Sequence, residues 1–196
     1  LGALGRSSGE PWSVVARAQH QAEDLHAAIS AAKHPVIVAG EQHQPGLAQA
    51  ITDLASATGV PVFADALSQL RRKDLAAQAP IIAAYDLILR SKPARSQLAP
   101  DLIVCVGQLP TSKPLRQWLT GSDCRQIVID PRGRNQDPSR RASDFWVCDP
   151  LTSFAAAAGS AVGRSAATGW TSSWERFELV AQSAIDHALG EEPFPL

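Results

Sequence analysis

The sequence predicts an α/β fold, a doubly wound, mostly parallel Rossmann-like sheet with helices on both faces. Short uninterrupted apolar runs, of which residues 102–107 are the clearest, alternate with segments whose apolar residues recur at helical spacing. Apolar strands without polar alternation are typical of a sheet covered on both faces, and strand–helix alternation is typical of parallel connections. We place this α/β domain over residues 15–160.

The first half of the domain contains two helix–strand pairs. Apolar residues recur from 18 to 32 and predict a helix that ends before Pro35, because proline disfavours helix in the residue preceding it. Residues 36–40 form a short run that begins with three β-branched residues, ends in glycine and predicts a buried strand. A helix over 47–58, closed by a glycine, and a strand over 61–64 follow.

The second half continues the alternation after a longer connection. Residues 65–80 predict a loop, and residues 82–90 predict a helix ending at an arginine. The remaining predicted elements are a strand at 102–107, a short helix at 115–119, strands at 126–130 and 145–148, and a helix over 151–158.

Two segments flank the domain. Residues 1–14 are rich in Gly, Ser and Pro and predict a linker. Residues 161–196 predict a second linker of small and polar residues, then a helix from about Trp170 to Gly190 that leads toward a further domain. The chain begins with Leu1 and contains no methionine, so we expect it to be a piece of a longer protein.

Charge and composition exclude several classes of partner. Eighteen basic and 19 acidic residues give a net charge of -1, so we expect neither nucleic acid nor an anionic membrane as a partner. No apolar run approaches the roughly 20 residues of a membrane span. The three cysteines and five histidines show no metal-ligand spacing, and we expect reduced thiols in a cytoplasmic protein.

The loop after residues 102–107 is the strongest candidate site. Thr111 or Ser112 can cap a helix that carries Pro114 in its first turn, and Lys113 adds a charge beside these hydroxyls. Ligands of parallel sheets bind beyond the carboxyl ends of the strands, and helix N-termini attract anions. The pattern predicts a carboxylate or phosphate site; the alternative is an ordinary capped helix with a solvated lysine.

Other polar groups support weaker hypotheses. Basic residues could line a second anion site or form a solvated face, namely Arg71, Arg72, Lys73, Arg90, Arg95 and Arg116. Asp130 follows a strand and could accept a ribose hydroxyl, but residues 40–43 lack the G-x-G-x-x-G pattern of dinucleotide sites. The chain has no G-x-S-x-G elbow, P-loop or zinc motif.

Several segments in succession resemble the 2-succinyl-5-enolpyruvyl-6-hydroxy-3-cyclohexene-1-carboxylate (SEPHCHC) synthase family. Its stretch P-V-x-A-D-x-L-S-x-L-R is similar to residues 61–71, and its T-[SG]-K-x-L-x-Q-W pattern to residues 111–118. The similarity runs over residues 34–150. The other matching segments are residues 85–90, 100–107, 129–133 and 136–138.

The resemblance implies the middle of three domains. The full-length enzyme would decarboxylate 2-oxoglutarate on thiamine diphosphate held with Mg²⁺, and add the resulting unit to isochorismate in menaquinone or phylloquinone biosynthesis. The cofactor-binding G-D-G segment and the activating glutamate would lie in the other two domains. The resemblance therefore implies no catalytic residue and no metal site in this chain, inactivity alone, and a homodimeric or homotetrameric parent.

The resemblance also implies roles for individual residues. Lys113 would contact isochorismate, a dicarboxylate, with Ser112 and Thr111 beside it. Dihydroxynaphthoate, a late pathway intermediate, would act as an effector, and the arginines that we select for its site are Arg90, Arg116 and Arg71.

Two alternatives remain at this point. The chain could be an FAD- or nucleotide-holding central domain of another thiamine diphosphate enzyme, or a purely structural domain that packs two cofactor domains together. The T-S-K-P-L-R-Q-W run and the missing G-x-G-x-x-G favour the synthase over the flavin-binding reading. The synthase and structural readings are compatible.

Overall fold

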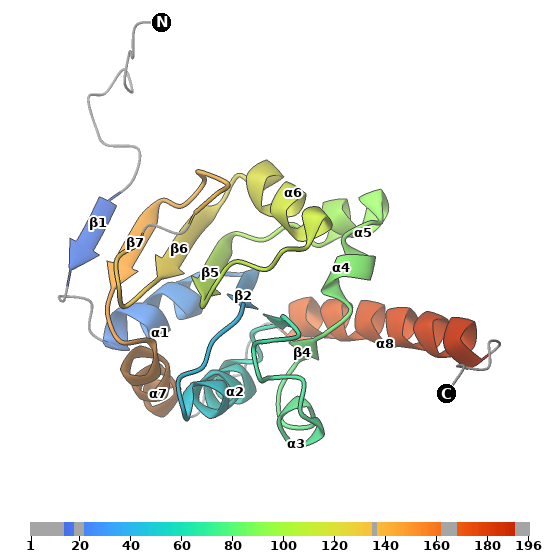
Figure 1. The fold of residues 1–196 in the computed structure, drawn as a ribbon, viewed down its shortest axis with the longest axis horizontal. Helices are drawn as coiled ribbons and strands as arrows, with labels where there is room; N and C mark the ends of the chain where they lie inside the picture. Colours follow the sequence, from blue (N-terminus) through green and yellow to red (C-terminus); the bar gives the residue numbers. More distant parts are fainter. Residues whose placement is uncertain (1–13, 18–21, 135–136, 162–167, 191–196) are drawn as a thin grey trace, which may run out of the picture.

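The computed structural model describes residues 14–17, 22–134, 137–161 and 168–190. Within these residues, seven strands form one sheet in the order β1-β7-β6-β5-β2-β3-β4 (Figure 1). Every neighbouring pair of strands is parallel. The strands are β1 (Val14–Arg17), β2 (Pro35–Ala39), β3 (Val62–Ala64), β4 (Ile81–Ile82), β5 (Leu102–Val106), β6 (Arg125–Ile129) and β7 (Asp144–Val147).

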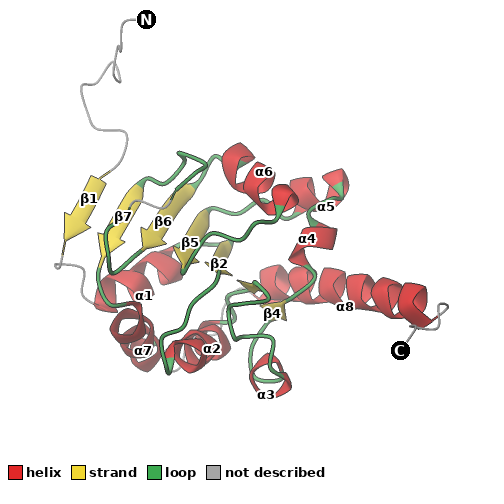
Figure 2. Ribbon diagram, viewed as in Figure 1, coloured by secondary structure: helices red, strands yellow, loops and turns green. Residues whose placement is uncertain are grey.

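Helices cover both faces of the sheet, which confirms the predicted doubly wound fold (Figure 2). One face carries α1 (Ala22–Ala31), α2 (Leu47–Thr58) and α7 (Pro150–Ser160). The other face carries α4 (Tyr85–Ile88), α5 (Lys92–Gln97), α6 (Lys113–Gly121) and α8 (Thr168–Gly190). The short helix α3 (Lys73–Ala76) lies in the connection between β3 and β4.

The two faces bury separate hydrophobic cores. In β2, Ile37 packs into the core beneath α1, α2 and α7, while Val36 and Val38 pack into the core on the α6 and α8 side. Successive side chains of a strand point to opposite faces, so a strand buried on both sides must be apolar throughout. The second core is rich in aromatic side chains, and Phe63 stacks on Tyr85 at 5.5 Å between ring centroids.

The strand order places a topological switch beside β2. From β2 the chain proceeds outward through β3 and β4, then returns to β5 on the other side of β2 and continues to β6 and β7. The loops that follow β2 and β5 therefore leave the sheet in opposite directions from neighbouring strands. Crevices at such points are the usual ligand sites of open parallel sheets.

Most predicted elements are confirmed, and the differences concern short ones. The predicted helix over 82–90 was wrong at its start, because Ile81–Ile82 pair with β3 as strand β4 and only Tyr85–Ile88 are helical. The predicted loop over 65–80 contains α3, and α5 was not predicted. Strand β1 was also not predicted, and it includes Val14, the last residue of the first predicted linker. Residues 1–13 and 162–167 lie outside the described residues.

Helix α8 packs one face against the domain, most tightly at its start. Trp174 is fully buried, and Trp170 donates its indole N–H to the carbonyl of Pro35 at 2.9 Å. The Thr171 hydroxyl donates to the carbonyl of Gly59 at 2.6 Å. Ala181 is also buried in the core on this side of the sheet, and Ile185 packs against it. The opposite face of α8 is open, with Leu179 71% exposed, and the end of the helix projects from the body of the domain (Figure 1).

The Glu178 carboxylate anchors α8 to the segment after β4. It accepts hydrogen bonds from the backbone N–H groups of Ala83, at 3.1 Å, and Ala84, at 2.9 Å. We expect Glu178→Ala to lower the free energy of unfolding by about 1–3 kcal/mol, because two part-buried amides lose their acceptor. Urea denaturation measures this change.

Glu175→Ala is the matched control for Glu178→Ala. Glu175 lies on the same helix with an exposed side chain. The two substitutions change helix propensity equally, so equal losses of stability would refute the proposed anchor.

Candidate functional site

A glycine contact joins the loops that follow β2 and β5. Gly40 donates its N–H to Val106 at 2.9 Å, and Gln108 donates its N–H to Glu41 at 2.9 Å. A Cβ at Gly40 would lie 1.5 Å from the carbonyl oxygen of Gln108. Gly107 has φ +76°, and a Cβ there would lie 2.6 Å from the carbonyl oxygen of Glu41. Only glycine fits at Gly40, so these residues fix the path of both loops at the switch point.

A crevice of about 410 Å³ lies beside this contact, where the switch-point rule predicts a ligand. The buried carboxylate of Asp130 accepts the N–H groups of Arg132 at 3.1 Å and Arg134 at 2.8 Å. Asp130 is thus engaged by its own loop, and the structure gives no support to its predicted role as a ribose acceptor. The lining residues are Glu41, Gln42, His43, Gln44, Leu47, Gly107, Gln108, Ile129, Asp130, Pro131, Arg132, Arg134 and Pro150.

Of the two residues predicted to cap α6, Ser112 is the cap and Thr111 is not. The Ser112 hydroxyl accepts the N–H of Leu115 at 3.2 Å, Pro114 occupies the first turn, and Thr111 is exposed. Proline has no N–H, so Lys113 carries the only first-turn amide of α6 without a hydrogen-bond partner among the described residues. The start of α6 therefore offers an anion fewer backbone N–H groups than the sequence led us to expect.

Asp86 ties the start of α6 to α4. One of its carboxylate oxygens accepts the Ser112 hydroxyl at 2.5 Å, and the other accepts the Arg90 guanidinium at 2.9 and 3.0 Å. Partial burial acts to raise the pKa of Asp86, but the Ser112 hydroxyl and Arg90 outweigh it and hold that pKa below its usual value. Asp86 lies in α4, which follows the carboxyl end of β4. Its ionised carboxylate therefore holds Ser112 at the carboxyl edge of the sheet.

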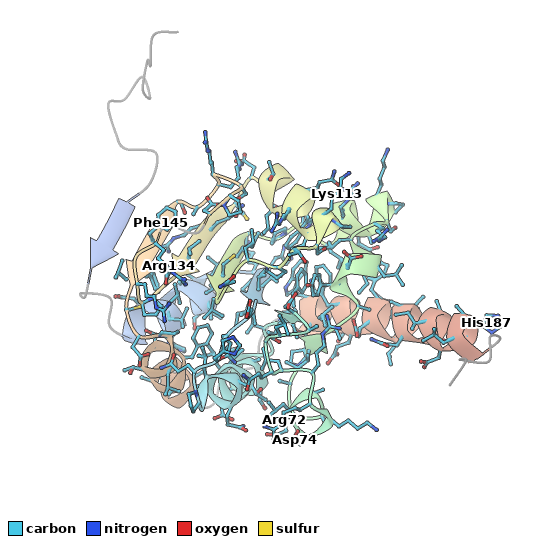
Figure 3. The ribbon with its side chains drawn as sticks, in the orientation of Figure 1. Arg72, Asp74, Lys113, Arg134, Phe145 and His187 are labelled. Carbon is cyan, nitrogen blue, oxygen red and sulfur yellow. The ribbon has the colours of Figure 1, made fainter. Side chains whose placement is uncertain are left out.

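Lys113 lies on a shallow depression formed by the residues that directly follow α4, by α5 and by α6. The depression has a volume of about 280 Å³ and brings together three cationic side chains, Lys113, Arg90 and Arg95. Its other lining residues are Leu89, Pro114 and Gln117. Figure 3 shows Lys113 on the α6 side of the sheet, well apart from Arg134, which lines the crevice at the switch point. The lysine and the crevice are therefore separate candidate sites.

The other predicted arginines do not line this depression. Arg116 donates its Nε–H to the carbonyl of Pro110 at 3.1 Å, and Arg71 donates its Nε–H to the carbonyl of Ala64 at 2.8 Å. Both side chains are exposed. Of the three arginines selected from the sequence, the structure brings only Arg90 beside Lys113.

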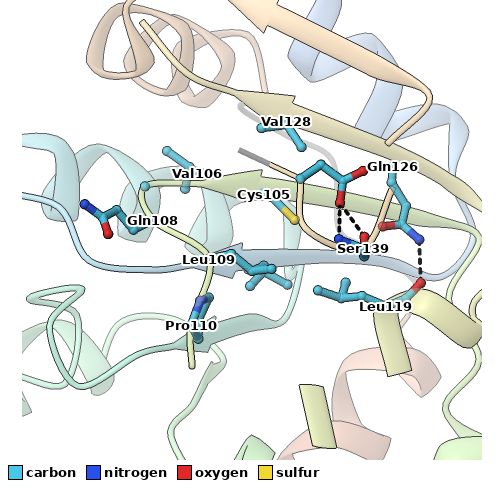
Figure 4. A pocket seen from close by; sticks show the side chains of 12 residues that line it. Cys105, Val106, Gln108, Leu109, Pro110, Leu119, Gln126, Val128 and Ser139 are labelled. Carbon is cyan, nitrogen blue, oxygen red and sulfur yellow. Dashed lines mark hydrogen bonds between the residues drawn. The ribbon is translucent and has the colours of Figure 1, made fainter. Parts of the chain in front are cut away.

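A narrow cavity between β5, β6 and α6 contains the Cys105 side chain (Figure 4). Its free space is about 10 Å³, at the lower limit for one water molecule. Burial, followed by the charge of Asp137, raises the pKa of Cys105 to about 12, so the thiol is protonated and unreactive. Cys124 and Cys148 are also free thiols. This cavity has neither the room nor the chemistry of a ligand site.

The described residues show neither a metal-ligand group nor a membrane-spanning helix. Within them, no three His, Cys, Asp or Glu side chains come together in a group that could hold a metal ion. The described helices include none with the length and apolar character to span a bilayer.

Titration of Tyr85 tests the packing at the carboxyl edge of the sheet near β3 and β4. Its hydroxyl donates to Asp65 at 3.3 Å, and burial, followed by the charge of Asp65, raises its pKa to about 12. Tyr85 is the single tyrosine of the chain, so alkaline titration of tyrosinate absorbance reports it directly. We expect a midpoint near pH 12 in the folded chain and near 10 in urea.

The raised pKa of Tyr85 also predicts how stability depends on pH. Between pH 10 and 12 the folded chain holds the tyrosine proton while the unfolded chain has lost it, so stability falls as the pH rises through this window. Below pH 10 this contribution is fully present. Circular dichroism of the same samples must show that the chain is folded, and a folded midpoint near 10 would contradict the buried position.

Comparison with known proteins adds a family. A family model described as "Middle domain of thiamine pyrophosphate" matches residues 6–194. Several curated relatives carry the name 2-succinyl-5-enolpyruvyl-6-hydroxy-3-cyclohexene-1-carboxylate synthase. The protein from Geobacillus kaustophilus is 35% identical over 181 residues, which are 89% of this chain and 30% of the relative.

Two further relatives with the same name show the extent of the match. The protein from Halobacterium salinarum is 36% identical over 95% of this chain and 32% of its own length. The protein from Microcystis aeruginosa is 45% identical over 53% of this chain and 18% of its own length. The chain thus spans about a third of the length of the relatives from Geobacillus kaustophilus and Halobacterium salinarum.

Proposed function

Because the chain belongs to the thiamine pyrophosphate middle-domain family, we propose that it serves as the middle domain of a SEPHCHC synthase. The names of the similar proteins and the extent of the match support this assignment. The proposed parent enzyme decarboxylates 2-oxoglutarate and adds the resulting four-carbon unit to isochorismate.

The proposed role of this chain is binding and positioning. Thiamine pyrophosphate supplies the electron sink for decarboxylation when it is bound. The described residues offer no metal-ligand group that suits its Mg²⁺, and we assign no step of the cofactor chemistry to them. What this chain contributes is an arrangement of cationic side chains that suits a carboxylate substrate.

The depression at the start of α6 is the observation that carries this proposal. Lys113 is exposed there beside Arg90, and none of the ion pairs of the described residues involves Lys113. An ammonium group without an acidic partner, close to a guanidinium, attracts a carboxylate of isochorismate. We propose that Ser112 holds Lys113 in position, because its hydroxyl caps α6 and donates to Asp86. Thr111 has an exposed hydroxyl next to them and would contact the same ligand.

The effector proposal is centred on Arg90. Dihydroxynaphthoate carries one carboxylate, and Arg90 lines the Lys113 depression with its guanidinium at the surface. Arg116 and Arg71 donate to backbone carbonyls outside this depression. We therefore propose Arg90, ahead of Arg116 and Arg71, as the main contact of the effector carboxylate. Isochorismate and dihydroxynaphthoate would then compete for binding, because their sites would share the cationic side chains of this depression.

An activity assay of the protein that contains this chain tests the proposed function. With thiamine pyrophosphate, Mg²⁺ and 2-oxoglutarate, we expect CO₂ release and product formation that depend on isochorismate. Consumption of 2-oxoglutarate that is indifferent to isochorismate would contradict the proposal. Flavin absorbance in the purified protein would favour the flavin-binding alternative instead.

A further inference from the structure

We propose that Arg95 is a further anion-binding residue of the Lys113 depression and holds a ligand carboxylate together with Lys113. The inference rests on the proposed function, which assigns the depression to a carboxylate ligand. It adds a residue of α5 to a site otherwise built from α6 and the residues that directly follow α4.

The position of Arg95 links two hollows of the surface. Its side chain lines the Lys113 depression and also a neighbouring trough of about 580 Å³ between α5 and α6. Gln117 on α6 lines both hollows as well. Arg95 therefore lies where the two hollows meet and shares the lining of the depression with Lys113.

Arg95 also lacks the partners that neighbouring arginines have. Arg90 pairs with Asp86, and Arg116 donates to a backbone carbonyl. Among the hydrogen bonds and ion pairs of the described residues, none involves the Arg95 guanidinium, although the residue is half-buried. A partly desolvated charge without a partner is unfavourable, and its five N–H donors suit a carboxylate with two oxygens.

The charges around the depression leave two cations for a ligand. Asp86 is engaged by Arg90 and the Ser112 hydroxyl, so its charge offsets Arg90. Lys113 and Arg95 have no such carboxylate among the described residues. A carboxylate is the shared chemistry of isochorismate and dihydroxynaphthoate, and it satisfies both cations at once.

Lys92 provides a matched control. It lies on the same helix, three residues before Arg95, and its exposed side chain lines the neighbouring trough but not the Lys113 depression. Arg95→Ala and Lys92→Ala each remove one positive charge from α5. A general effect of net charge on anion binding would be the same in both variants.

Calorimetric titration of this chain and its variants with isochorismate, and separately with 1,4-dihydroxy-2-naphthoate, tests the inference. We expect Arg95→Ala to weaken binding by about 10- to 100-fold, Lys92→Ala by less than about threefold, and Arg95→Lys to retain part of the affinity. The thermal midpoint of Arg95→Ala should equal or exceed that of the parent chain, because an unpaired charge is removed. If the affinity for isochorismate falls, the substrate occupies the depression. If the affinity for 1,4-dihydroxy-2-naphthoate falls, the effector occupies it.

The outcomes separate this inference from the proposed function. If Lys113→Ala weakens binding and Arg95→Ala behaves like Lys92→Ala, Arg95 is not part of the site although the site exists. If neither Lys113→Ala nor Arg95→Ala changes the affinity, or if the unmodified chain binds neither ligand, the proposed carboxylate site itself is wrong and the inference fails with it.

Discussion

Replacing Lys113 with alanine is expected to weaken the binding of isochorismate by about 10- to 100-fold, the usual worth of a hydrogen bond to a charged group. The exposed ammonium group shares its depression with Arg90 and Arg95, and Asp86 is already engaged by Arg90. A carboxylate that docks there loses its partner when the ammonium group is removed. Calorimetric titration of the chain measures the affinity, and the KM for isochorismate reports it in the longer enzyme.

Two further variants define what the Lys113 result means. Lys113→Arg keeps the charge and should retain more affinity than Lys113→Ala, although its planar donors differ from an ammonium group. Lys73→Ala removes another exposed lysine, from α3 and outside the depression, and should leave the affinity unchanged. Equal loss in Lys73→Ala and Lys113→Ala would show that net charge alone attracts the ligand.

Replacing Gly40 with alanine is expected to lower the free energy of unfolding by about 2–4 kcal/mol. The added Cβ would lie 1.5 Å from the carbonyl oxygen of Gln108, a backbone atom that cannot move aside without displacing the loop. The hydrogen bonds of Gly40 to Val106 and of Gln108 to Glu41 would be strained or broken. Urea denaturation monitored by circular dichroism measures the loss.

The same substitution in α7 serves as the control for Gly40→Ala. Gly159 lies within α7, and a Cβ there would meet no atom within 4 Å. Alanine is the better helix former, so Gly159→Ala should leave stability unchanged or raise it by up to about 1 kcal/mol. Similar losses in both variants, or none at Gly40, would contradict the described contact between the two loops.

The fold could be predicted because its central strands are continuous apolar runs. Residues 102–107 and 36–40 have no polar alternation, which only a sheet covered on both faces explains. The elements that were not predicted are short: β4 has two residues, β1 and α3 have four each, and α5 has six. Periodicity needs more residues than these to give a signal, and tertiary packing decides their structure.

The candidate site was predictable only in its local part. A hydroxyl cap at Thr111 or Ser112, with Pro114 in the first turn, follows from residue types at adjacent positions of one helix start, and the structure selects Ser112. The bond between Ser112 and Asp86 joins residues 26 positions apart, and Arg95 reaches the depression from another helix. No local pattern encodes such contacts, so Arg95 could be named only as one basic residue among several.

A titration that observes all lysines at once tests the central claim most directly. The chain has four lysines, Lys33, Lys73, Lys92 and Lys113, so ¹³C-methylated lysine resonances can each be assigned by one Lys→Arg variant. With isochorismate added, we predict that the Lys113 resonance shifts in a saturable manner while those of Lys33 and Lys73 stay in place. A saturable shift at another lysine with Lys113 unmoved, or no saturable shift at all, would contradict the assignment of the α6 depression as the carboxylate site.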